Sequence, residues 1–367
     1  MLVGGSVRDA IDQRFRFIAK DFDFIIRRDL VDSAASKVKS ELGGTIVRLK
    51  FEQTVRVVLK GGTVVDLSAP NGDCLDVDLA NRDYTINSIG WSPKECFIDK
   101  QNGSGDIRRG VVRAIREQNL NDDPLRVLRA YRFVAERGYK IHLKTRGLLN
   151  KYAKRIIEPA RERVTEEMIR ILNSDNALAA LKLALDDGLL QIVFAQDISA
   201  IKNKLQLIKR LDGNKREQTF GLTGVGLIRL ELLMFGANLD DTRLVLSNEA
   251  RKRVESFSRA YSRKVPAARS EALYELFGKA GGSALDVLRA THREDLRCEL
   301  QRYQRIQKRE IVSADEIIAS GVERGPGLGR LIKEIQMLRF MGKLKTNKDC
   351  MLYINSLKQH YVNRLLS

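Results

Sequence analysis

Two acidic residues near the N-terminus, Asp21 and Asp23, are separated by a single phenylalanine and follow Lys20. Side chains alternate along a strand, so both carboxylates would project from one face while Phe22 and Phe24 pack into the core. Two hard cations held by such carboxylates can activate an attacking hydroxyl and stabilise a leaving pyrophosphate. The pair therefore indicates a metal site, although a solvated edge strand with two exposed acids would show the same pattern.

A third carboxylate is needed to complete such a site. Asp66 follows Val64 and Val65 at the end of an apolar run that could form a strand beside the first one. The alternative is a turn-forming aspartate, because Ser68 and Pro70 come shortly after it.

A glycine pair, Gly4 and Gly5, comes between an apolar strand end and the start of a predicted helix. Backbone N–H groups in such a turn can approach a phosphate closely, and a helix N-terminus favours an anion. Arg8 adds a fork of donors for a phosphate oxygen. A glycine pair alone is a weak signal, and the sequence contains no GxxxxGK[ST] motif.

The segment 78–87 (DLANRDYTIN) supplies Arg82 for phosphate and Asp83 or Asn87 for sugar hydroxyls. Further on, an acidic pair at 122–123 precedes three arginines at intervals of three residues, Arg126, Arg129 and Arg132. This spacing places acids and then guanidinium groups on one helical face. The opposite side would be packed by Leu125, Leu128 and Phe133. A salt-bridged solvent face would show the same spacing.

The composition is that of a soluble globular protein, with 43% hydrophobic and 31% charged residues over 367 positions. No run of 18 apolar residues predicts a membrane span, and the N-terminus lacks the features of a signal peptide, so we expect a cytoplasmic protein. Four scattered cysteines and three histidines predict reduced thiols, no zinc site and no paired His-Asp phosphohydrolase centre.

The net charge is +18 and the sequence pI is about 9.8, which indicates a polyanionic partner. Basic and acidic residues nearly balance over residues 1–112, so almost all of the excess positive charge lies beyond them. This distribution is typical of a catalytic head joined to a region that grips nucleic acid.

Short β-rich runs and a helix alternate in the first 110 or so residues, which predicts an α+β domain with a small mixed sheet. The predicted strands are Asp23–Arg27, Thr45–Leu49, Val55–Leu59 and Thr63–Leu67, with a hairpin turn at Gly61 and Gly62 and a helix over Leu30–Leu42. Beyond residue 113 the periodicity becomes helical to the end of the chain. Helices are predicted over 123–137, 163–173 and 177–190, with loops near 212–214, 281–282 and 321–329.

The order and spacing of these motifs resemble those of class II tRNA nucleotidyltransferases and bacterial poly(A) polymerases, which share a DNA-polymerase-beta-like head. The matching pieces are GGSVRD, DFDF, DLANRDYTIN, DDPLRVLRAYRF with a following GY, Glu162-Arg163-Val164 with Glu167, and GPGLGR at 325–330. The resemblance covers essentially the whole chain and is strongest over residues 2–170.

The resemblance implies an N-terminal nucleotidyltransferase head (1–112), followed by an all-helical neck that recognises the base (113–174), a body (175–310) and a tail (311–367) that bind RNA. It implies that Asp21 and Asp23 bind two Mg²⁺ ions, with Asp66 as a further catalytic carboxylate. It also implies a nucleotide site made by Gly4, Gly5, Arg8, Arg82, Asp83, Asn87, Asp123, Arg126, Arg129 and Arg132.

Within that site, Gly5 and Arg8 would hold the triphosphate, and Asp123 with Arg126 would read the base edge. A carboxylate can accept a hydrogen bond from the exocyclic amine of C or A, which U lacks, and a guanidinium can donate to ring acceptors. Each bidentate contact of this kind discriminates by about 1–3 kcal/mol.

Three features depart from the family pattern. The glycine turn comes very early, which predicts a shortened first strand or a trimmed N-terminus, and Asn81 stands where the family has arginine. Asp122 replaces the usual glutamate. The segment 67–81 is short, and because enzymes that add only the two cytidines tend to have a shortened loop there, it favours CC addition.

The sequence therefore predicts an enzyme that adds CMP, and in a full CCA-adding enzyme also AMP, to tRNA lacking its 3′ CCA. The substrates would be CTP and ATP, the cofactor Mg²⁺, and no membrane would be involved. A poly(A) polymerase or A-adding enzyme of the same family is the alternative, and a non-catalytic RNA-binding protein is the alternative of another class. The sequence leaves the choice between monomer and homodimer open.

Overall fold

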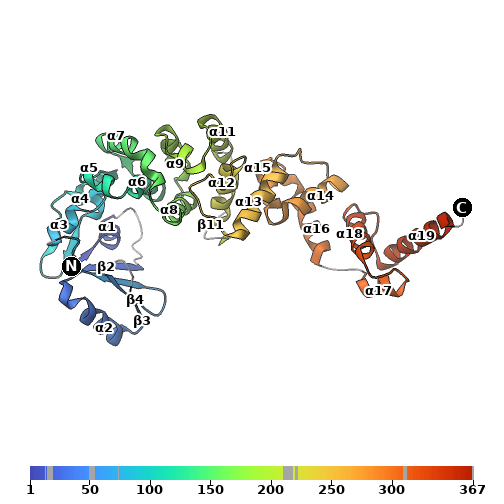
Figure 1. Ribbon diagram of the computed structural model, residues 1–367, viewed down its shortest axis with the longest axis horizontal. Coiled ribbons are helices and arrows are strands. Elements are labelled where there is room, and N and C mark those ends of the chain that lie inside the picture. Colours follow the sequence, from blue (N-terminus) through green and yellow to red (C-terminus); the bar gives the residue numbers. More distant parts are fainter. Residues whose placement is uncertain are drawn as a thin grey trace. The chain divides into compact units, whose positions relative to one another are not determined.

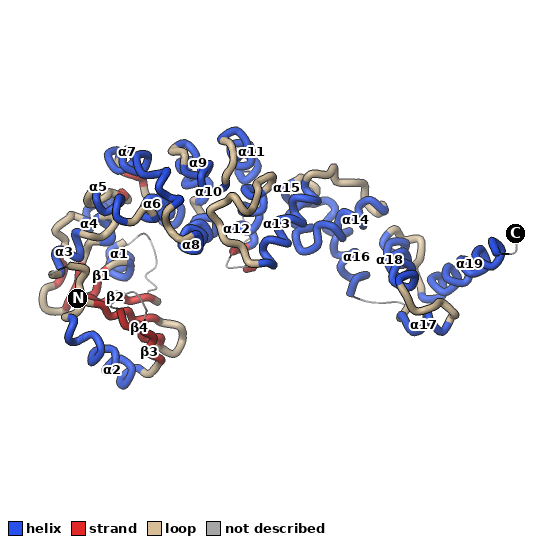
Figure 2. Tube along the Cα trace, in the orientation of Figure 1, coloured by secondary structure: helices blue, strands red, loops and turns tan. Residues whose placement is uncertain are grey.

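The computed structural model describes residues 1–12, 14, 20–48, 54–72, 74–209, 218–219, 222–308 and 312–365. Strands gather in the N-terminal part and helices make up most of the rest, which confirms the predicted α+β head followed by helices (Figures 1 and 2). The chain forms two compact units. The first comprises Met1–Lys209, Gly221–Gly226 and Ala237–Val245, and the second comprises Arg210–Phe220, Leu227–Gly236 and Leu246–Ser367. The finer division into head, neck, body and tail stays a prediction.

A seven-stranded mixed sheet lies in the first unit, in the order β3-β4-β5-β2-β1-β6-β7. Its strands are β1 (Leu2–Val3), β2 (Asp21–Ile25), β3 (Thr45–Arg48), β4 (Thr54–Val58), β5 (Val64–Ser68), β6 (Gly90–Ser92) and β7 (Cys96–Ile98). Only β2 and β5 pair in parallel, and the other neighbours are antiparallel. Because β2 and β5 run in register, Asp23 lies directly opposite Asp66.

The predicted hairpin at Gly61 and Gly62 is confirmed, since β4 and β5 pair across it. Both glycines have positive φ, 92° and 83°, a conformation that L side chains rarely adopt. The strands differ from their predicted bounds by one or two residues, and the last residue of the predicted 45–49 strand lies outside the described residues. Asp66 sits in the middle of β5 and not at a strand end.

Helix α2 (Val31–Leu42) covers one face of the sheet. Val31 and Ala35 are buried against Val57, Val65 and neighbouring valine and leucine side chains of β4 and β5. Phe24 packs against the same cluster, as predicted, whereas Phe22 is only half-buried. The helix ends at Gly43, whose φ is 75°.

Other helices of the first unit include α1 (Gly5–Ile11) and α3 (Leu75–Ala80), which lie between strands of the sheet, and α4 (Gly103–Arg109), α5 (Glu117–Asp122), α6 (Leu125–Arg137), α7 (Leu143–Tyr152) and α8 (Arg161–Asn173), which follow it. Helix α6 is central because it packs against both α8 and α9 (Ala177–Asp186). Its predicted apolar side is confirmed: Leu125, Leu128 and Phe133 are all buried. Pro124 stands at its N-cap and Gly138, with φ 64°, at its C-cap.

The remaining helices are α10 (Leu189–Phe194), α11 (Ile198–Lys209), α12 (Gly224–Met234), α13 (Asn248–Tyr261), α14 (Glu271–Ala280), α15 (Ala284–Ala290), α16 (Arg297–Lys308), α17 (Ala314–Ala319), α18 (Pro326–Phe340) and α19 (Asn347–Leu365). Short 3₁₀ turns are η1 (Arg28–Leu30), η2 (Thr85–Asn87), η3 (Ala153–Ile157), η4 (Gly281–Ser283) and η5 (Glu294–Leu296). No helix in this described part of the chain combines the length and apolar character needed to cross a bilayer.

Four expectations about these elements need correction. The predicted helix over 177–190 is two helices, because Gly188 has φ 77° and interrupts it. Residues 281–282 begin a 3₁₀ turn, and the loop predicted over 321–329 ends at Gly325, since Pro326 starts α18. Strands also occur beyond residue 113: β9 (Lys140–Ile141) pairs in parallel with β8 (Val111–Val112), and β10 (Gln218–Thr219) and β11 (Leu222–Thr223) are equally short. The loop predicted at 212–214 lies outside the described residues.

The second unit is held together by an aromatic cluster. Tyr274 and Phe277 of α14, Tyr303 of α16 and Phe340 of α18 have ring centroids 5.1–6.4 Å apart. Phe340 belongs to the predicted tail and the other rings to the predicted body, so the two predicted regions share one core.

Replacing Leu128 by alanine should destabilise the first unit by about 2–5 kcal/mol, because the side chain is fully buried in α6 and the change leaves a cavity. Urea unfolding followed by fluorescence of Trp91, the single tryptophan and a residue of the same unit, would measure this. Leu143→Ala is the matched control, since that side chain is 83% exposed. Equal unfolding midpoints for the two variants would contradict the assignment of α6 to the core.

Candidate active site

One cleft of about 480 Å³ in the first unit gathers most of the predicted site residues. Those that line it are Gly4, Gly5, Arg8, Asp21, Asp23, Arg82, Asp83, Asn87, Arg126, Arg129 and Arg132. Asp66 and Asp123 are not among its lining residues. Four further residues line it that the sequence had not singled out for this site, Ser6, Asp9, Lys20 and Arg170.

The glycine turn brings three chemical groups together. Gly4 has φ 76° and ψ −137°, and it precedes α1, whose first turn is closed by a hydrogen bond from the Arg8 amide to the Gly4 carbonyl. A Cβ atom at Gly4 would lie 3.0 Å from Asp23 Oδ2 and 3.1 Å from Arg82 Nη1. The missing side chain therefore allows a carboxylate and a guanidinium to approach the start of the helix from the cleft.

The carboxylates of β2 carry uncompensated negative charge. Asp21 is exposed and Asp23 is half-buried. Burial raises the pKa of Asp23 above its ordinary value, and the neighbouring Asp66 and Asp21 carboxylates add to this effect while Arg82 opposes it. A divalent cation would remove the repulsion that destabilises the ionised form.

Asp66 lies beside Asp23, but its two oxygens are occupied. Arg56 donates from Nε to Asp66 Oδ1 at 2.8 Å and from Nη2 to Oδ2 at 2.7 Å. This partner could not be predicted from the sequence, because it depends on the antiparallel register that sets Arg56 opposite Asp66. A catalytic role for Asp66 stays a prediction.

The donor set at β2 fits magnesium. Among the described residues, no group of three or more His, Cys, Asp or Glu side chains is arranged to hold a metal ion, so the set consists of the Asp21 and Asp23 carboxylates. Mg²⁺ in phosphate-handling sites is commonly held by one or two carboxylates together with substrate phosphates and water. Such a site is completed only when the nucleotide is bound.

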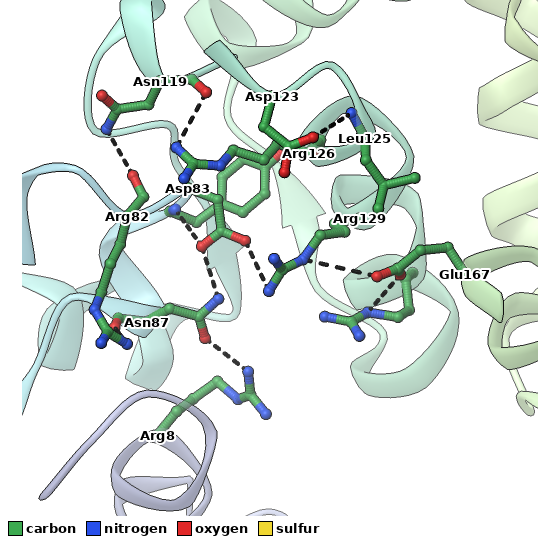
Figure 3. Close-up of polar contacts among 12 residues, drawn as sticks. Arg8, Arg82, Asp83, Asn87, Asn119, Asp123, Leu125, Arg126, Arg129 and Glu167 are labelled. Atoms are coloured by element: carbon green, nitrogen blue, oxygen red, sulfur yellow. Dashed lines mark hydrogen bonds and ion pairs between the residues drawn. The ribbon is translucent and has the colours of Figure 1, made fainter. Parts of the chain in front are cut away.

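Asp83 is the hub of the polar contacts beside this cleft (Figure 3). Its Oδ1 accepts hydrogen bonds from the Tyr84 amide and from Asn87 Nδ2, both at 2.8 Å, and its Oδ2 lies 3.1 Å from Arg129 Nη2. Burial opposes ionisation of Asp83, but Arg129, the Asn87 amide and the Tyr84 amide outweigh it and lower the pKa. The carboxylate that was expected to contact ribose is thus engaged by protein groups.

Arg8 is held on three sides. It donates from Nη1 to Asn87 Oδ1 at 2.7 Å and from Nε to Asp9 Oδ1 at 2.8 Å, and its guanidinium lies 5.1 Å from the ring centroid of Phe133. Asn87 therefore links the glycine-turn helix to Asp83 (Figure 3).

The arginines of α6 share one buried glutamate, Glu167 of α8. Arg132 Nε lies 3.2 Å from Glu167 Oε2, and Arg129 Nε lies 3.8 Å from Oε1. Burial raises the pKa of Glu167 and lowers that of Arg132 to about 10, and their mutual attraction opposes both shifts. Arg132, expected to support phosphate and base, is the most buried of the four arginines of α6.

The two residues expected to read the base are anchored separately. Asp123 accepts a hydrogen bond from the Leu125 amide at 3.2 Å and an ion pair from Arg163 Nη2 at 2.9 Å. Arg126 Nη1 donates to the backbone carbonyl of Asn119 at 3.0 Å (Figure 3) and to that of Asn81 at 2.8 Å. Arg126 lines the cleft, whereas Asp123 is held beside it.

Asn119 is a positioning residue that the sequence did not reveal. Its buried side-chain amide donates to the carbonyls of Ala80 and Arg82 at 2.8 and 2.6 Å. It thereby ties the Arg82 turn to α5, while its own carbonyl holds Arg126. Nothing in the local sequence distinguishes this asparagine from a surface residue.

Comparison with known proteins agrees with this arrangement. Residues 1–113 match the family model of the poly(A) polymerase head domain, and residues 138–201 match a model described as the probable RNA and SrmB-binding site of polymerase A. The fold and the cleft thus define a nucleotidyltransferase head followed by helices.

Curated relatives include enzymes that act on tRNA. A CC-adding tRNA nucleotidyltransferase from Synechocystis sp. is 35% identical over 64% of this chain and 58% of its own length. A CCA-adding enzyme from Leuconostoc mesenteroides is 25% identical over 98% of this chain and 92% of its own length. The chain spans about half the length of the CC-adding relatives that it matches.

A solved structure, the Thermotoga maritima CCA-adding enzyme complexed with tRNA, shares the fold with a TM-score of 0.76 at 21% identity, over 97% of this chain and 90% of that one. Residues 1–113 and 138–201 are thus similar to domains of the poly(A) polymerase family, and the chain is similar to CC-adding tRNA nucleotidyltransferases and CCA-adding enzymes.

Gly4→Ala should weaken binding of CTP with Mg²⁺ by about tenfold or more, because the new Cβ is strained at positive φ and crowds Asp23 and Arg82. Isothermal titration calorimetry would measure the affinity. Gly147→Ala is the control, since a Cβ there meets nothing within 4 Å. Unchanged affinity in Gly4→Ala would show that the glycine turn is not part of the nucleotide site.

Asp83→Asn should lower the stability of the first unit by about 3 kcal/mol at neutral pH, because it leaves Arg129 without its buried counter-charge. The folded-state pKa of Asp83 lies below its ordinary value of 3.8, so the ionised form stabilises the fold above that value. The difference between wild type and variant should therefore be constant from pH 8 to about pH 5 and narrow as the pH falls below about 4. Urea unfolding across this range checks both statements, and a difference that widens in acid would contradict them.

Proposed function

We propose that this protein is a template-independent nucleotidyltransferase that adds CMP to tRNA 3′ ends from CTP, with ATP as the further substrate of full CCA addition. The observation that carries this proposal is the single cleft in which the glycine turn, the Asp21 and Asp23 carboxylates and the α6 arginines meet. In the reaction the RNA 3′-oxygen forms a bond to the α-phosphorus, and the bond from that phosphorus to the pyrophosphate oxygen breaks.

The protein's own groups would bind and orient the nucleotide. The backbone amides after Gly4, together with Arg8 and Arg82, would hold the triphosphate. Arg129 and Arg132 would face the nucleotide from α6, and their positions are supported by Asp83 and Glu167. Proximity of this kind converts a bimolecular reaction into a step within one complex.

Asp21 and Asp23 would hold Mg²⁺, with two ions expected. When bound, the metal would lower the pKa of the attacking hydroxyl and balance the charge that develops on the phosphates. The half-buried Asp23 would offer its carboxylate to the metal from the middle of β2, and Asp66 would add negative charge beside it.

Selection of the base would rest on Asp123 and Arg126. Both are fixed by protein contacts before any nucleotide binds, which limits the geometries that they can offer to a base. Arg126 donates to backbone through Nη1, so its other N–H groups remain for the cleft.

Addition of C residues alone is supported by the compact connection between β5 and Arg82. Asp78 of α3 accepts a hydrogen bond from the Asn71 amide at 2.9 Å and pairs with Arg82 at 3.1 Å. The short segment is thus folded onto the site residue that follows it. A poly(A) polymerase or an A-adding enzyme is the second candidate, because the head matches the poly(A) polymerase head model.

The RNA would be tRNA lacking its 3′ CCA, gripped through its phosphates by the basic part of the chain beyond the head. The match of residues 138–201 to an RNA-binding model supports this assignment, as do the helical neck, body and tail expected over 113–174, 175–310 and 311–367. With tRNA as the acceptor, the enzyme would act in the cytoplasm.

The deciding experiment incubates the purified chain with Mg²⁺, tRNA lacking its CCA and labelled CTP alone, ATP alone or both together, and reads product lengths on a sequencing gel. Two C additions are expected from CTP both without and with ATP, and none from ATP alone. A CCA end, a single A or an A tract would each replace the CC-adding assignment, and no incorporation of any nucleotide would favour a non-catalytic RNA-binding protein.

Asp23→Ala should abolish incorporation in this assay while leaving tRNA affinity within about twofold, because it removes a metal ligand and not an RNA contact. Filter binding measures the affinity. Asp76→Ala is the matched control, as that carboxylate is exposed and pairs with Lys100 outside the cleft. Incorporation by Asp23→Ala at the wild-type rate would refute the metal assignment.

A further inference from the structure

Asp9 carries a contact that the proposed chemistry does not explain. Its Oδ1 is shared by two arginines, Arg8 Nε and Arg137 Nη2, each at 2.8 Å. Asp9 and Arg8 line the cleft, whereas Arg137 is the last residue of α6 and is not among the lining residues. We propose that Arg137 is a positioning residue for the triphosphate, which acts through Asp9 on the Arg8 guanidinium. This inference rests on the proposed function.

All three side chains are largely withdrawn from solvent. The exposed fractions are 9% for Arg8, 29% for Asp9 and 16% for Arg137. An ion pair at this depth is screened much less than a surface pair, and removal of one partner is correspondingly costly. The Asp9 carboxylate lies between two cations, so loss of Arg137 would free it to turn away from Arg8.

The orientation of Arg8 decides where its remaining donors point. Nε is used by Asp9 and Nη1 by Asn87, and the flat face of the guanidinium lies over Phe133. Nη2 lies 3.5 Å from the position that a Cβ on Gly5 would take. Within the described residues this Nη2 donates no hydrogen bond. Its two N–H groups lie beside the glycine turn and remain for a ligand there.

The same helix holds Arg8 from its other side. Arg8 contacts Asn87, Asn87 contacts Asp83, and Asp83 contacts Arg129, which belongs to α6 (Figure 3). Arg129 and Arg137 are eight positions apart, about 12 Å along the helix axis at 1.5 Å per residue. Helix α6 therefore holds Arg8 at two points. Arg129 acts through Asp83 and Asn87, and Arg137 acts through Asp9.

The two contacts between Arg8 and α6 bear on how a nucleotide is held. Arg126, expected to read the base, lies near the start of α6, and Arg137 lies at its end. Fixing Arg8 to this helix sets the distance between the phosphate donors and the base-reading residue. Loss of Arg137 should therefore weaken the binding of a ligand made only of phosphates, even though Arg137 lies outside the cleft.

The test measures binding of tripolyphosphate with Mg²⁺ by calorimetry and steady-state kinetics with CTP. Arg137→Ala should weaken tripolyphosphate binding and raise the KM for CTP in parallel, by about threefold to tenfold. The KM for tRNA should stay unchanged, because the proposed contact acts on the triphosphate donors and not on the RNA. Arg137→Lys keeps the charge within reach of Asp9 and should recover most of the affinity.

Arg146→Ala is the matched control. Arg146 forms an ion pair of the same kind with the buried Asp187 at 2.8 Å, in the same unit but remote from the cleft residues in its contacts. Its loss should leave tripolyphosphate binding unchanged. Urea unfolding of each variant establishes that it is folded under the assay conditions.

A double-mutant cycle separates the relay from a general loss of stability. If Arg137 acts only through Asp9, then adding Arg137→Ala to Asp9→Ala should weaken tripolyphosphate binding no further. Wild-type affinity in Arg137→Ala, additive losses in the double variant, or an equal loss in Arg146→Ala would each overturn the inference. A wild-type protein that binds tripolyphosphate but incorporates no nucleotide would instead refute the proposed function, so the two failures are distinguishable.

Discussion

The buried ion pair between Asp83 and Arg129 is the contact on which the arrangement of the cleft depends. Two ions withdrawn from water are costly unless every remaining lone pair and proton finds a partner. Here Asp83 Oδ1 accepts hydrogen bonds from the Tyr84 and Asn87 amides, whereas within the described residues Asp83 Oδ2 and Arg129 Nε have only ion pairs, with Arg129 Nη2 and Glu167 Oε1. The pair joins the segment between β5 and β6 of the sheet to α6, so the sheet residues and the helix arginines come to one place.

Charges of opposite sign alternate outward from that pair. On one side Asn87 leads to Arg8 and Asp9, and on the other Glu167 leads to Arg132. Arrangements of this kind are conformationally specific, because a carboxylate left without its arginine is far less stable than either the full network or an apolar replacement. The cost of burial is visible in Arg132 and Glu167. Burial lowers the pKa of Arg132 and raises the pKa of Glu167, and both shifts favour the neutral form. A rigid set of cations facing a cleft is what a triphosphate requires, since preformed donors lose little entropy on binding.

Most of the candidate site could be predicted from residue types and spacing, because each motif is local. Strand alternation predicts that Asp21 and Asp23 share one face, and helix periodicity predicts arginines of α6 opposite Leu128 and Phe133. The turn at Gly4, where φ is positive, is predicted by the glycine pair itself. The partners of these residues could not be predicted. Arg56 reaches Asp66 only through strand register, and Asn119 reaches Ala80 and Arg82 only because α5 packs against that turn.

The sequence by itself determined the order of elements, the α+β head with a helical remainder and the chemical character of the cleft, since alternation, helical periodicity and glycine turns act within a few residues. Only the tertiary structure decided which charges neutralise one another. Asp123 is held by Arg163, and Asp9 by Arg137, through contacts that join residues 40 and 128 positions apart. Such pairs are fixed by the packing of α6 against the sheet segment and α8, and no local pattern records which of the many arginines a given carboxylate will meet.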